Sequence, residues 1–239
     1  MLITRTKSCF KKEVLINKML LTKEESKMRT IEELKRYKKV LYVIDMVNGF
    51  VKEGPLHDKH ICGTIPEQIK LLEKMKKENE AIAFVKESHS INSMEFKNFP
   101  PHCIEGTSEA LLVPELQLYE KDALVYLKNS TSAMFAPQMM EHLIAMENLE
   151  EVIGVGCCTD ICVLNFLVPL KNYFNQMNRD IDVIAVKNAI DTYHIPGIHN
   201  REEYEMMAYK LMEQAGIILV DDINDLIKTE GVLTRRRVK

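Results

Sequence analysis

Cys162 lies in a stretch of sequence that can turn a thiol into a nucleophile. The stretch begins at Val152 with apolar, β-prone residues and two glycines, and it reaches Thr159 and Asp160, which are residue types that often begin a helix. Cys162 would then lie in the first turn of that helix, where unpaired backbone N–H groups and the helix dipole favour thiolate over thiol. The alternative is a small apolar side chain in the core, which is a common role for a free cysteine.

Asp45 and Lys128 are charged residues at the ends of two other predicted strands. Asp45 interrupts the apolar run Lys39–Val47, and Lys128 lies near the end of the run Ala123–Asn129. Burying a polar group without a partner costs about 2–7 kcal/mol, and a charge costs more, so Asp45 is expected to have a partner. With Cys162, the two residues suit acyl transfer through a thioester. The carboxylate accepts the thiol proton, the ammonium stabilises both anions, and the thiolate attacks a carbonyl.

The backbone near Cys162 could also take part in such a reaction. The N–H groups around Cys158 and Cys162 would be placed to hold the oxyanion that develops on the carbonyl. The thiols of Cys157 and Cys158 are themselves expected to be core or strand-end groups. Because these cysteines lack the Cys-x-x-Cys spacing of a zinc clamp, the sequence does not favour a structural zinc site here.

A second group of candidate residues lies at the start of the long irregular region 88–118. Glu87 and His89 stand at the end of the second predicted strand, and Glu95 and His102 follow in Glu-Phe-Lys-Asn-Phe-Pro-Pro-His. Carboxylate and imidazole together suit a borderline divalent ion such as zinc, manganese or iron. Their spacing alone also fits a solvated loop, so these residues leave both readings open.

The elements that must position these residues follow from the alternation of apolar runs and helical patterns. Six strands are expected, at Lys39–Val47, Ala81–Glu87, Ala123–Asn129, Val152–Cys157, Ile181–Ile190 and Ile217–Val220. Strands that alternate with helices predict an α/β fold, with a parallel sheet covered by helices on both faces. Ligands bind at the carboxyl ends of the strands in such sheets, where Asp45, Lys128 and Cys162 all fall. We expect an N-terminal extension over 1–29 and a single domain over 30–239.

Composition narrows the function classes. The chain has 239 residues, and its formal net charge of −3 argues against nucleic acid or an anionic membrane as the main partner. No apolar run reaches the roughly 18 residues of a membrane span, and the first thirty residues lack the apolar segment of a signal peptide. We therefore expect a cytoplasmic protein with free thiols, whose partner is a small molecule. The sequence leaves open whether it forms a homo-oligomer.

Three motifs resemble the isochorismatase-like cysteine hydrolases. They are Val-Ile-Asp-Met-Val-Asn-Gly-Phe around Asp45, Lys128 near a strand end, and Gly-Cys-Cys-Thr-Asp-Ile-Cys-Val around Cys162. The resemblance covers roughly residues 38–225. Within that family, Phe-Pro-Pro-His-Cys-Ile-Glu-Gly-Thr, which contains His102, resembles the nicotinamidases, which bind a metal beside the substrate.

The resemblance implies a fold and a catalytic set. The fold would be a three-layer α/β/α arrangement around a six-stranded parallel sheet of order 3-2-1-4-5-6, with strands one and four side by side. Asp45 would be the base, Lys128 its electrostatic partner and Cys162 the nucleophile. The peptide before Cys158 would be cis, so that the N–H groups of Cys158 and Cys162 form the oxyanion hole.

The resemblance also implies a metal site and an aromatic pocket. The matching residues are Glu87, His89, Glu95 and His102 for the metal, and Phe50, Phe99 and Phe135 for the pocket. Zinc is favoured over manganese or iron. Two features depart from the family pattern: the first metal ligand is usually Asp, which is one methylene shorter than Glu87, and the loop between His89 and Glu95 is short.

The function implied is hydrolysis of nicotinamide to nicotinate and ammonia through a cysteine thioester, in NAD salvage. One alternative is a related hydrolase that acts on another amide or carbamoyl group. A different class is a non-catalytic scaffold, in which Cys162 would be no more reactive than Cys9.

Overall fold

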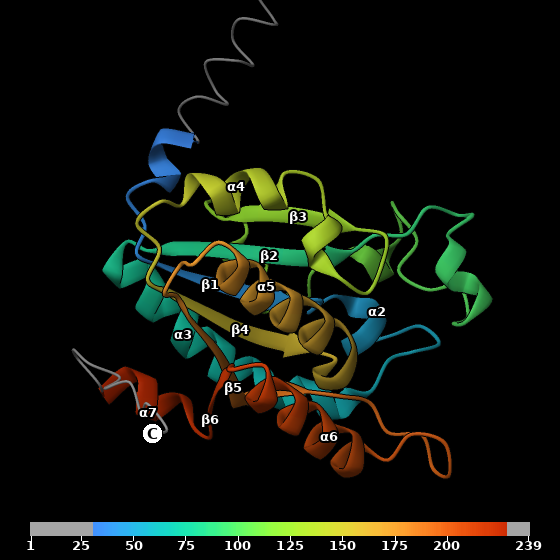
Figure 1. Ribbon diagram of the computed structural model, residues 1–239. Coiled ribbons are helices and arrows are strands. Elements are labelled where there is room, and N and C mark those ends of the chain that lie inside the picture. The colour runs from blue at the N-terminus through green and yellow to red at the C-terminus, as the bar shows by residue number, and fades with distance from the viewer. Residues whose placement is uncertain (1–30, 229–239) are drawn as a thin grey trace, which may run out of the picture.

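Six parallel strands form a central sheet in the computed structural model, which describes residues 31–228 (Figure 1). The order across the sheet is β3-β2-β1-β4-β5-β6, which confirms the expected fold. The strands are β1 (Lys39–Ile44), β2 (Ala81–Glu87), β3 (Leu124–Lys128), β4 (Glu151–Cys157), β5 (Asp182–Asp191) and β6 (Ile218–Val220). The predicted extension 1–29 lies outside the described residues.

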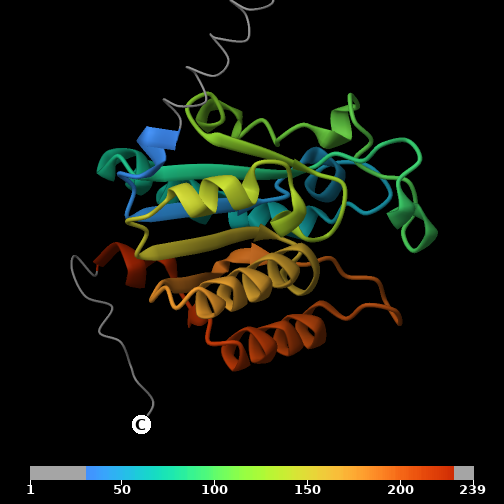
Figure 2. The same ribbon diagram turned by 45° about the horizontal axis from the view of Figure 1, so that its top comes forward.

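Helices cover both faces of this sheet. The α-helices are α2 (Asn48–Val51), α3 (Ile65–Glu78), α4 (Met139–Ala145), α5 (Leu164–Gln176), α6 (Arg201–Gln214) and α7 (Ile223–Lys228). Figures 1 and 2 show α3 and α7 on one face and α4, α5 and α6 on the other, which gives three layers. Within residues 31–228, no helix combines the length and the apolar character needed to cross a membrane.

Short 3-10 helices occur mainly in the loops at the carboxyl ends of the strands. They are η1 (Lys59–Thr64), η2 (Met94–Lys97), η3 (Ser108–Ala110), η4 (Gln117–Tyr119) and η5 (Ala133–Phe135). The long region between β2 and β3, which the sequence indicates to be irregular, contains three of them. It forms the green lobe of Figure 1 and brings several candidate residues back over the sheet.

The central strands are buried on both faces because both helical layers cover them. In β4 six of the seven residues are buried, and in β1 five of the six. The edge strand β3 instead alternates: Val125 is 40 % and Leu127 47 % exposed, whereas Tyr126 and Lys128 point inward. This alternation is typical of a strand with one solvated face. It sends Lys128, the last residue of the strand, toward the interior.

Gly156 lets β4 approach β1 closely at the end of the sheet that carries the candidate site. Its φ of +118° lies outside the range that other residues adopt readily. A Cβ atom on Gly156 would lie 2.0 Å from the carbonyl oxygen of Ile44, its partner on β1. A glycine is therefore required here, and it brings Asp45 beside the turn that follows β4.

The helix after β4 begins differently from the prediction. Thr159–Val163 form a single π-helical turn, η6, before α5 starts at Leu164. The residue before this turn is Cys158, and no side chain caps it, so the expectation that Thr159 or Asp160 caps the helix is wrong. The Asp160 carboxylate instead accepts hydrogen bonds from outside the turn. Single π turns of this kind are frequent at functional sites.

Candidate active site

The structure brings Asp45, Lys128 and Cys162 together at the carboxyl ends of the strands. Asp45 directly follows β1, Lys128 ends β3, and Cys162 lies in η6 after β4. The Lys128 Nζ atom is 2.8 Å from Asp45 Oδ2 and 3.6 Å from Cys162 Sγ. All three side chains are buried, with at most 4 % of each residue exposed. One ammonium thus touches both the carboxylate and the thiol.

Backbone contacts hold Asp45 in an uncommon conformation. Its φ of +51° is in the left-handed region, which aspartate tolerates better than most residues. Its N–H donates to the carbonyl of Val85 on β2 at 2.8 Å, and the thiol of Cys157 donates to its carbonyl at 3.2 Å. Neighbouring strands on both sides therefore fix the direction of the Asp45 side chain. Such strain is frequent at functional sites.

Glu87 is a second buried carboxylate that links this group to the histidines. Its Oε2 forms an ion pair with Lys128 and lies 3.8 Å from Cys162 Sγ. Its Oε1 lies 3.0 Å from His89 Nε2. Glu87 is 1 % exposed. The last residue of β2 therefore touches both sets of candidate residues, which the sequence presented as separate.

The balance of charges in this group sets the protonation states. Burial lowers the pKa of Lys128, but Asp45, Cys162 and Glu87 outweigh it and hold the pKa well above its ordinary value. Burial, with help from Glu87 and against Lys128, raises the pKa of Asp45 to about 7. Burial favours the protonated form of Glu87 too, yet Lys128 and His89 bring its pKa below the ordinary value.

The Cys162 thiol does not have the depressed pKa that its place near a helix start suggested. Burial raises its pKa well above the ordinary value, and Asp45 and Glu87 add to the rise while Lys128 opposes it. Burial is the largest cause and Lys128 does not outweigh it, so the structure does not support the expected resting thiolate. Cys162 therefore needs a base at the moment of attack, and Asp45 lies within reach.

His89 and His102 meet Glu87 in a geometry that fits a divalent cation. The Nε2 atoms of the two histidines are 3.3 Å apart. The His102 Nδ1 atom donates to the carbonyl of Pro100 at 2.8 Å, and His89 Nδ1 lies 3.0 Å from Asn129 Oδ1. Since both Nδ1 atoms face oxygen acceptors, each neutral ring presents a lone pair at Nε2.

Two lone pairs at this distance repel unless a proton or a metal ion lies between them, and Glu87, against the effect of burial, raises the pKa of His89. Glu87 Oε1 is buried, lies 3.0 Å from His89 Nε2 and faces the same space as the two histidine nitrogens. One atom each from Glu87, His89 and His102 lies within 4.8 Å of the others. The donor set and its outer hydrogen bonds match those of protein metal sites.

Glu95 lies beside this cluster rather than in it. Its Oε1 accepts a hydrogen bond from the Thr131 N–H at 2.7 Å, and its Oε2 is 3.8 Å from His89 Nε2. The three-residue set of possible ligands does not include it. The four predicted ligands therefore come together as three, with Glu95 adjacent.

A small pocket opens beside Cys162 and His102. Its lining comes from the end of β2 and from the segments that follow β1, β2, β3, β4 and β5: Phe50, Leu56, Glu87, Glu95, Phe99, His102, Thr131, Cys158, Ile161, Cys162 and Tyr193. The ring centroid of His102 is 5.5 Å from that of Phe50 and 6.2 Å from that of Phe99. Two of the three predicted aromatics therefore face the candidate metal ligands across this pocket.

Phe135 is the predicted aromatic that the structure does not bring to the pocket. It ends η5, its side chain is 82 % exposed, and it is not part of the pocket wall. The turn η5 lies after β3 and packs on α5, which directs Phe135 outward. A match of residue type in the sequence cannot show that direction.

The peptide between Cys157 and Cys158 is cis, as the resemblance implies. It lies between the end of β4 and η6, and both flanking side chains are buried. Cys158 also lines the pocket, next to Cys162. The N–H groups of these two residues thus belong to backbone at the pocket wall.

The isochorismatase domain model matches residues 39–223, which include every residue of this site. The chain belongs to the isochorismatase family. Nicotinamidase 1 of Arabidopsis thaliana is 27 % identical over 173 residues, which cover 65 % of this chain and 70 % of that protein.

Solved structures of the family share the fold. The nicotinamidase of Bacillus subtilis is 26 % identical, with a TM-score of 0.63 over 77 % of this chain and 99 % of that one. The pyrazinamidase of Pyrococcus horikoshii, solved in complex with zinc, is 21 % identical, with a TM-score of 0.62 over 77 % of this chain and 99 % of that one. As an isochorismatase-family protein, this chain is a hydrolase.

Several residues of this isochorismatase-family site were not found from the sequence. Tyr193, Thr131, Ile161 and Leu56 line the pocket, and the Phe96 ring lies 5.2 Å from that of His89. Asn129 directly follows β3, and Tyr193 lies just after β5. Because ligands bind at the carboxyl ends of parallel strands, the sequence could have identified both residues as candidates. The others lie in loops whose return to the sheet the sequence pattern does not show.

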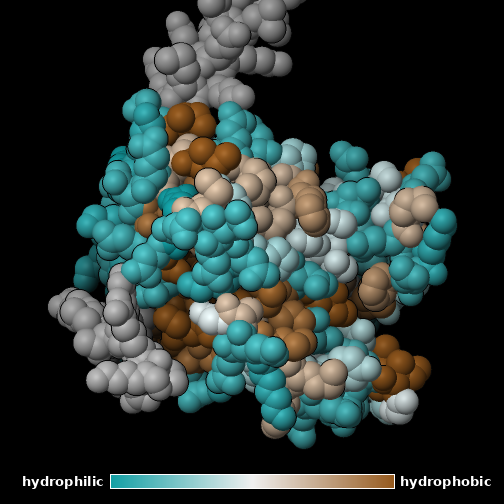
Figure 3. Space-filling model, in the orientation of Figure 1, coloured by the Kyte–Doolittle hydropathy of each residue, from teal (hydrophilic) through white to brown (hydrophobic). Residues whose placement is uncertain are grey.

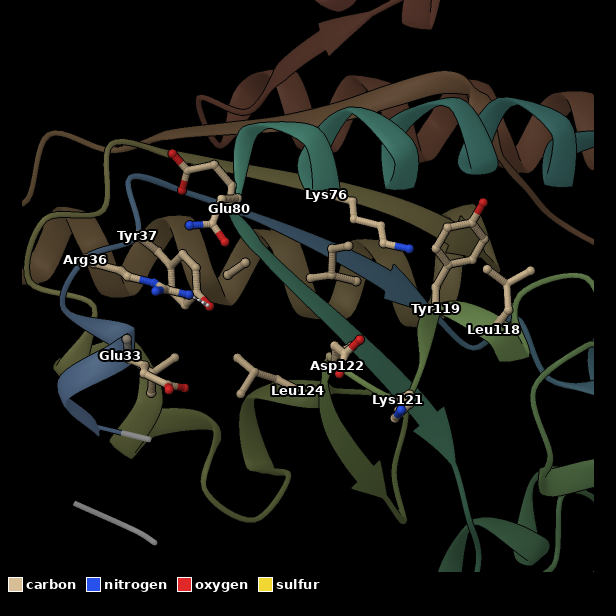
Figure 4. Close-up of a pocket in the computed structure, with 15 residues that line it drawn as sticks. Glu33, Arg36, Tyr37, Lys76, Glu80, Leu118, Tyr119, Lys121, Asp122 and Leu124 are labelled. Carbon is tan, nitrogen blue, oxygen red and sulfur yellow. Dashed lines mark hydrogen bonds between the residues drawn. The ribbon is translucent and has the colours of Figure 1, made fainter. Parts of the chain in front are cut away.

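A larger hollow lies elsewhere in this family member, at the amino-terminal ends of β2 and β3 (Figure 4). It measures about 510 Å³, and the labelled Glu33, Arg36, Lys76, Glu80 and Lys121 surround it. No cysteine or histidine lines it. Size alone would select this hollow, but the chemistry selects the pocket beside Cys162.

Proposed function

We propose that this hydrolase converts nicotinamide to nicotinate and ammonia through a thioester on Cys162. The observation that carries the proposal is that Lys128 contacts Asp45, Cys162 and Glu87 at once. Through Glu87, the acyl-transfer residues are joined to a candidate metal site that faces an aromatic pocket. The acyl-transfer residues suit the amide of a small aromatic amide, and the metal site with its aromatic pocket suits the ring. The nicotinamidases among the relatives support that substrate.

The first half of the reaction uses the chain's own side chains. Asp45 takes the proton from the Cys162 thiol as sulfur attacks the carboxamide carbon, and Lys128 stabilises the charges on both. The N–H groups of Cys158 and Cys162 hold the oxyanion. Asp45 then returns the proton to the amide nitrogen, the C–N bond breaks, and ammonia leaves.

The second half hydrolyses the thioester. Asp45 accepts a proton from a water molecule, whose oxygen attacks the acyl carbon. The C–S bond breaks, Asp45 returns its proton to the sulfur, and the nicotinic acid formed loses a proton to solvent to give nicotinate. One water is consumed for each amide cleaved, and the side chains return to their starting states.

Glu87, His89 and His102 would hold a divalent ion, with Glu95 close enough to contribute directly or through water. Zinc is the favoured ion, because the donor set suits it and a structural relative was solved with zinc. When bound, the ion would act as a Lewis acid toward the pyridine nitrogen and so orient the ring. Phe50 and Phe99 would contact the ring. We place this activity in NAD salvage in the cytoplasm.

The direct test is ammonia release from nicotinamide by purified protein. The wild type and the matched control Cys62→Ala, which lies outside the pocket, should release ammonia at similar rates. Cys162→Ala should release none above background. Equal rates from Cys162→Ala and the wild type would overturn the mechanism, whereas no release by the wild type would overturn the substrate.

A related hydrolase acting on another amide or carbamoyl group is the second candidate. It is favoured by the position of Glu95 outside the three-residue ligand set and by Glu87 in place of the usual aspartate. Metal analysis of protein purified without added ions separates the two. A bound divalent ion with nicotinamide hydrolysis supports the first candidate, and absence of both supports the second.

A further inference from the structure

A buried cluster of polar and aromatic side chains lies beside the turn that carries Cys162 and has no part in the proposed reaction. Its centre is His199, which is 5 % exposed and belongs to the loop between β5 and α6. In Figures 1 and 2 this orange loop extends from the end of the sheet where the active-site loops gather. The cluster joins that loop to η6.

His199 is stacked between two tyrosine rings. Its ring centroid is 4.0 Å from that of Tyr193, with 21° between the planes, and 3.9 Å from that of Tyr204, with 28°. Tyr204 belongs to α6, and Tyr193 lines the substrate pocket. The stack therefore connects the pocket wall to a helix.

Both ring nitrogens of His199 face acceptors. Nδ1 lies 2.9 Å from the carbonyl oxygen of Tyr193, and Nε2 lies 2.9 Å from Asp160 Oδ2. These two contacts hold the edge of the ring on both sides, one within the loop itself and the other at η6.

Asp160 connects His199 to the nucleophile turn. It lies in η6 two residues before Cys162, and its Oδ1 accepts a hydrogen bond from Thr192 Oγ1 at 2.6 Å. Arg201 Nε donates to the carbonyl of Thr192 at 2.8 Å. Thr192, the residue before Tyr193, is thus anchored both to η6 and to α6.

We propose that the Asp160–His199 pair positions Tyr193 as a fixed wall of the substrate pocket, held in register with Cys162. The pocket is narrow: its volume is about 30 Å³, against about 510 Å³ for the hollow at the other end of the sheet. With Tyr193 held in place, the narrow pocket selects flat, aromatic substrates. Asp160 and His199 are positioning residues that act through Tyr193.

Four variants test this role. Asp160→Ala removes both hydrogen bonds, whereas Asp160→Asn can still accept from Thr192 and keep a hydrogen bond to the His199 ring. His199→Ala removes the stack and the hydrogen bonds, whereas His199→Phe keeps an aromatic ring between the tyrosines. His60→Ala is the matched control, because it removes another histidine–aspartate contact (2.7 Å to Asp191) that does not touch Tyr193.

The first readout rests on the proposed function. For nicotinamide, Asp160→Ala and His199→Ala should raise KM about tenfold, with kcat changed much less, since a lost hydrogen bond to a charged group is worth roughly that factor. Asp160→Asn and the control should stay near the wild type. His199→Phe should fall between, because it retains the stack alone.

The second readout does not depend on the substrate. Cys162 is alkylated with iodoacetamide and with a bulky pyrenyl maleimide, and the ratio of the two rates reports the width of the pocket. The alanine variants should react relatively faster with the bulky reagent, by several-fold, and Asp160→Asn should not. If the alanine variants match His60→Ala in this ratio, the proposal is overturned, even where nicotinamide is not the substrate. Should either alanine variant fail to fold, a His199→Phe ratio equal to that of the wild type would overturn it as well.

Discussion

A hollow lies at each end of the sheet, and the side chains around the two hollows use charge in opposite ways. At the carboxyl ends, Asp45, Glu87 and Lys128 are buried, with at most 2 % of each exposed. At the amino-terminal ends, the hollow of about 510 Å³ is bordered by charged side chains that are mostly exposed (Figure 4).

The difference shows that buried charges, unlike exposed ones, indicate where a reaction takes place. Exposed charges cost little, so those around the larger hollow carry no information about a reaction. Arg36 lies over the Tyr37 ring, and Lys76 lies over that of Tyr119, as such side chains do on many surfaces. Buried charges are costly unless paired, so a group of four interacting residues at the other end requires a reason.

The largest difference between the two ends of the sheet is expected for substitution of the nucleophile. Cys162→Ala should lower kcat by about five to six orders of magnitude, as loss of a nucleophile does in other hydrolases. Lys121→Ala at the amino-end hollow should leave kcat and KM within about twofold, since an exposed side chain there has no reaction to support. Steady-state kinetics of both variants check this. A comparable loss in Lys121→Ala would contradict the contrast between the two ends.

Lys128 and Lys76 test the same contrast in stability. Lys128→Met leaves Asp45 and Glu87 as two buried carboxylates without a cation, so it should lower the free energy of unfolding by about 3–5 kcal/mol and abolish activity. Lys76→Met should change the free energy of unfolding by less than about 0.5 kcal/mol. Denaturant unfolding of the two variants measures the difference. Equal changes in the free energy of unfolding would show that the buried ion pairs of Lys128 stabilise the fold no more than the exposed contact of Lys76.

The pH dependence of kcat/KM tests the burial of Asp45. Asp45 must be ionised to accept the thiol proton, and burial raises its pKa to about 7. Activity should therefore fall as the pH drops below about 7, by roughly tenfold per unit, because the protonated carboxyl cannot act as a base. A profile that stays flat down to pH 5 would mean that Asp45 is not the base or is not shifted.

The metal site gives a smaller effect through its outer contacts. Asn129→Ala removes the contact to His89 Nδ1 and should weaken zinc affinity about 10- to 100-fold. Asn98→Ala, an exposed position in the same region, is the matched control and should leave the affinity unchanged. Competition with a chromogenic chelator measures both. Equal affinities would argue against a metal held by His89.

The sequence predicted the parts of the fold and site that depend on regular structure. The buried runs of β1 and β4 appear as continuous apolar residues, and the strand-end rule located Asp45 and Lys128. The family motif supplied the strand order and the cis peptide before Cys158. These features depend on local chemistry or on close approach of backbones, which residue types record directly.

The remaining features depend on how loops fold back over the sheet. The orientation of Phe135, the place of Glu95 beside the ligand set and the contacts of Tyr193 all arise from long-range packing. The protonation of Cys162 shows the same limit, because its position near a helix start suggested a thiolate, whereas burial beside two carboxylates favours the thiol. The net charge of a buried cluster can be counted only when the structure shows which residues belong to the cluster.

The most direct measurement is capture of the acyl-enzyme. Wild-type protein is mixed with nicotinamide, quenched in acid within milliseconds, and analysed by intact mass and peptide mapping. We predict a nicotinoyl group on the peptide that contains Cys162, which appears before ammonia release reaches its steady rate and is absent from Cys162→Ala. Steady ammonia release without any acyl group on that peptide, or an acyl group on another cysteine, would contradict the proposed role of Cys162.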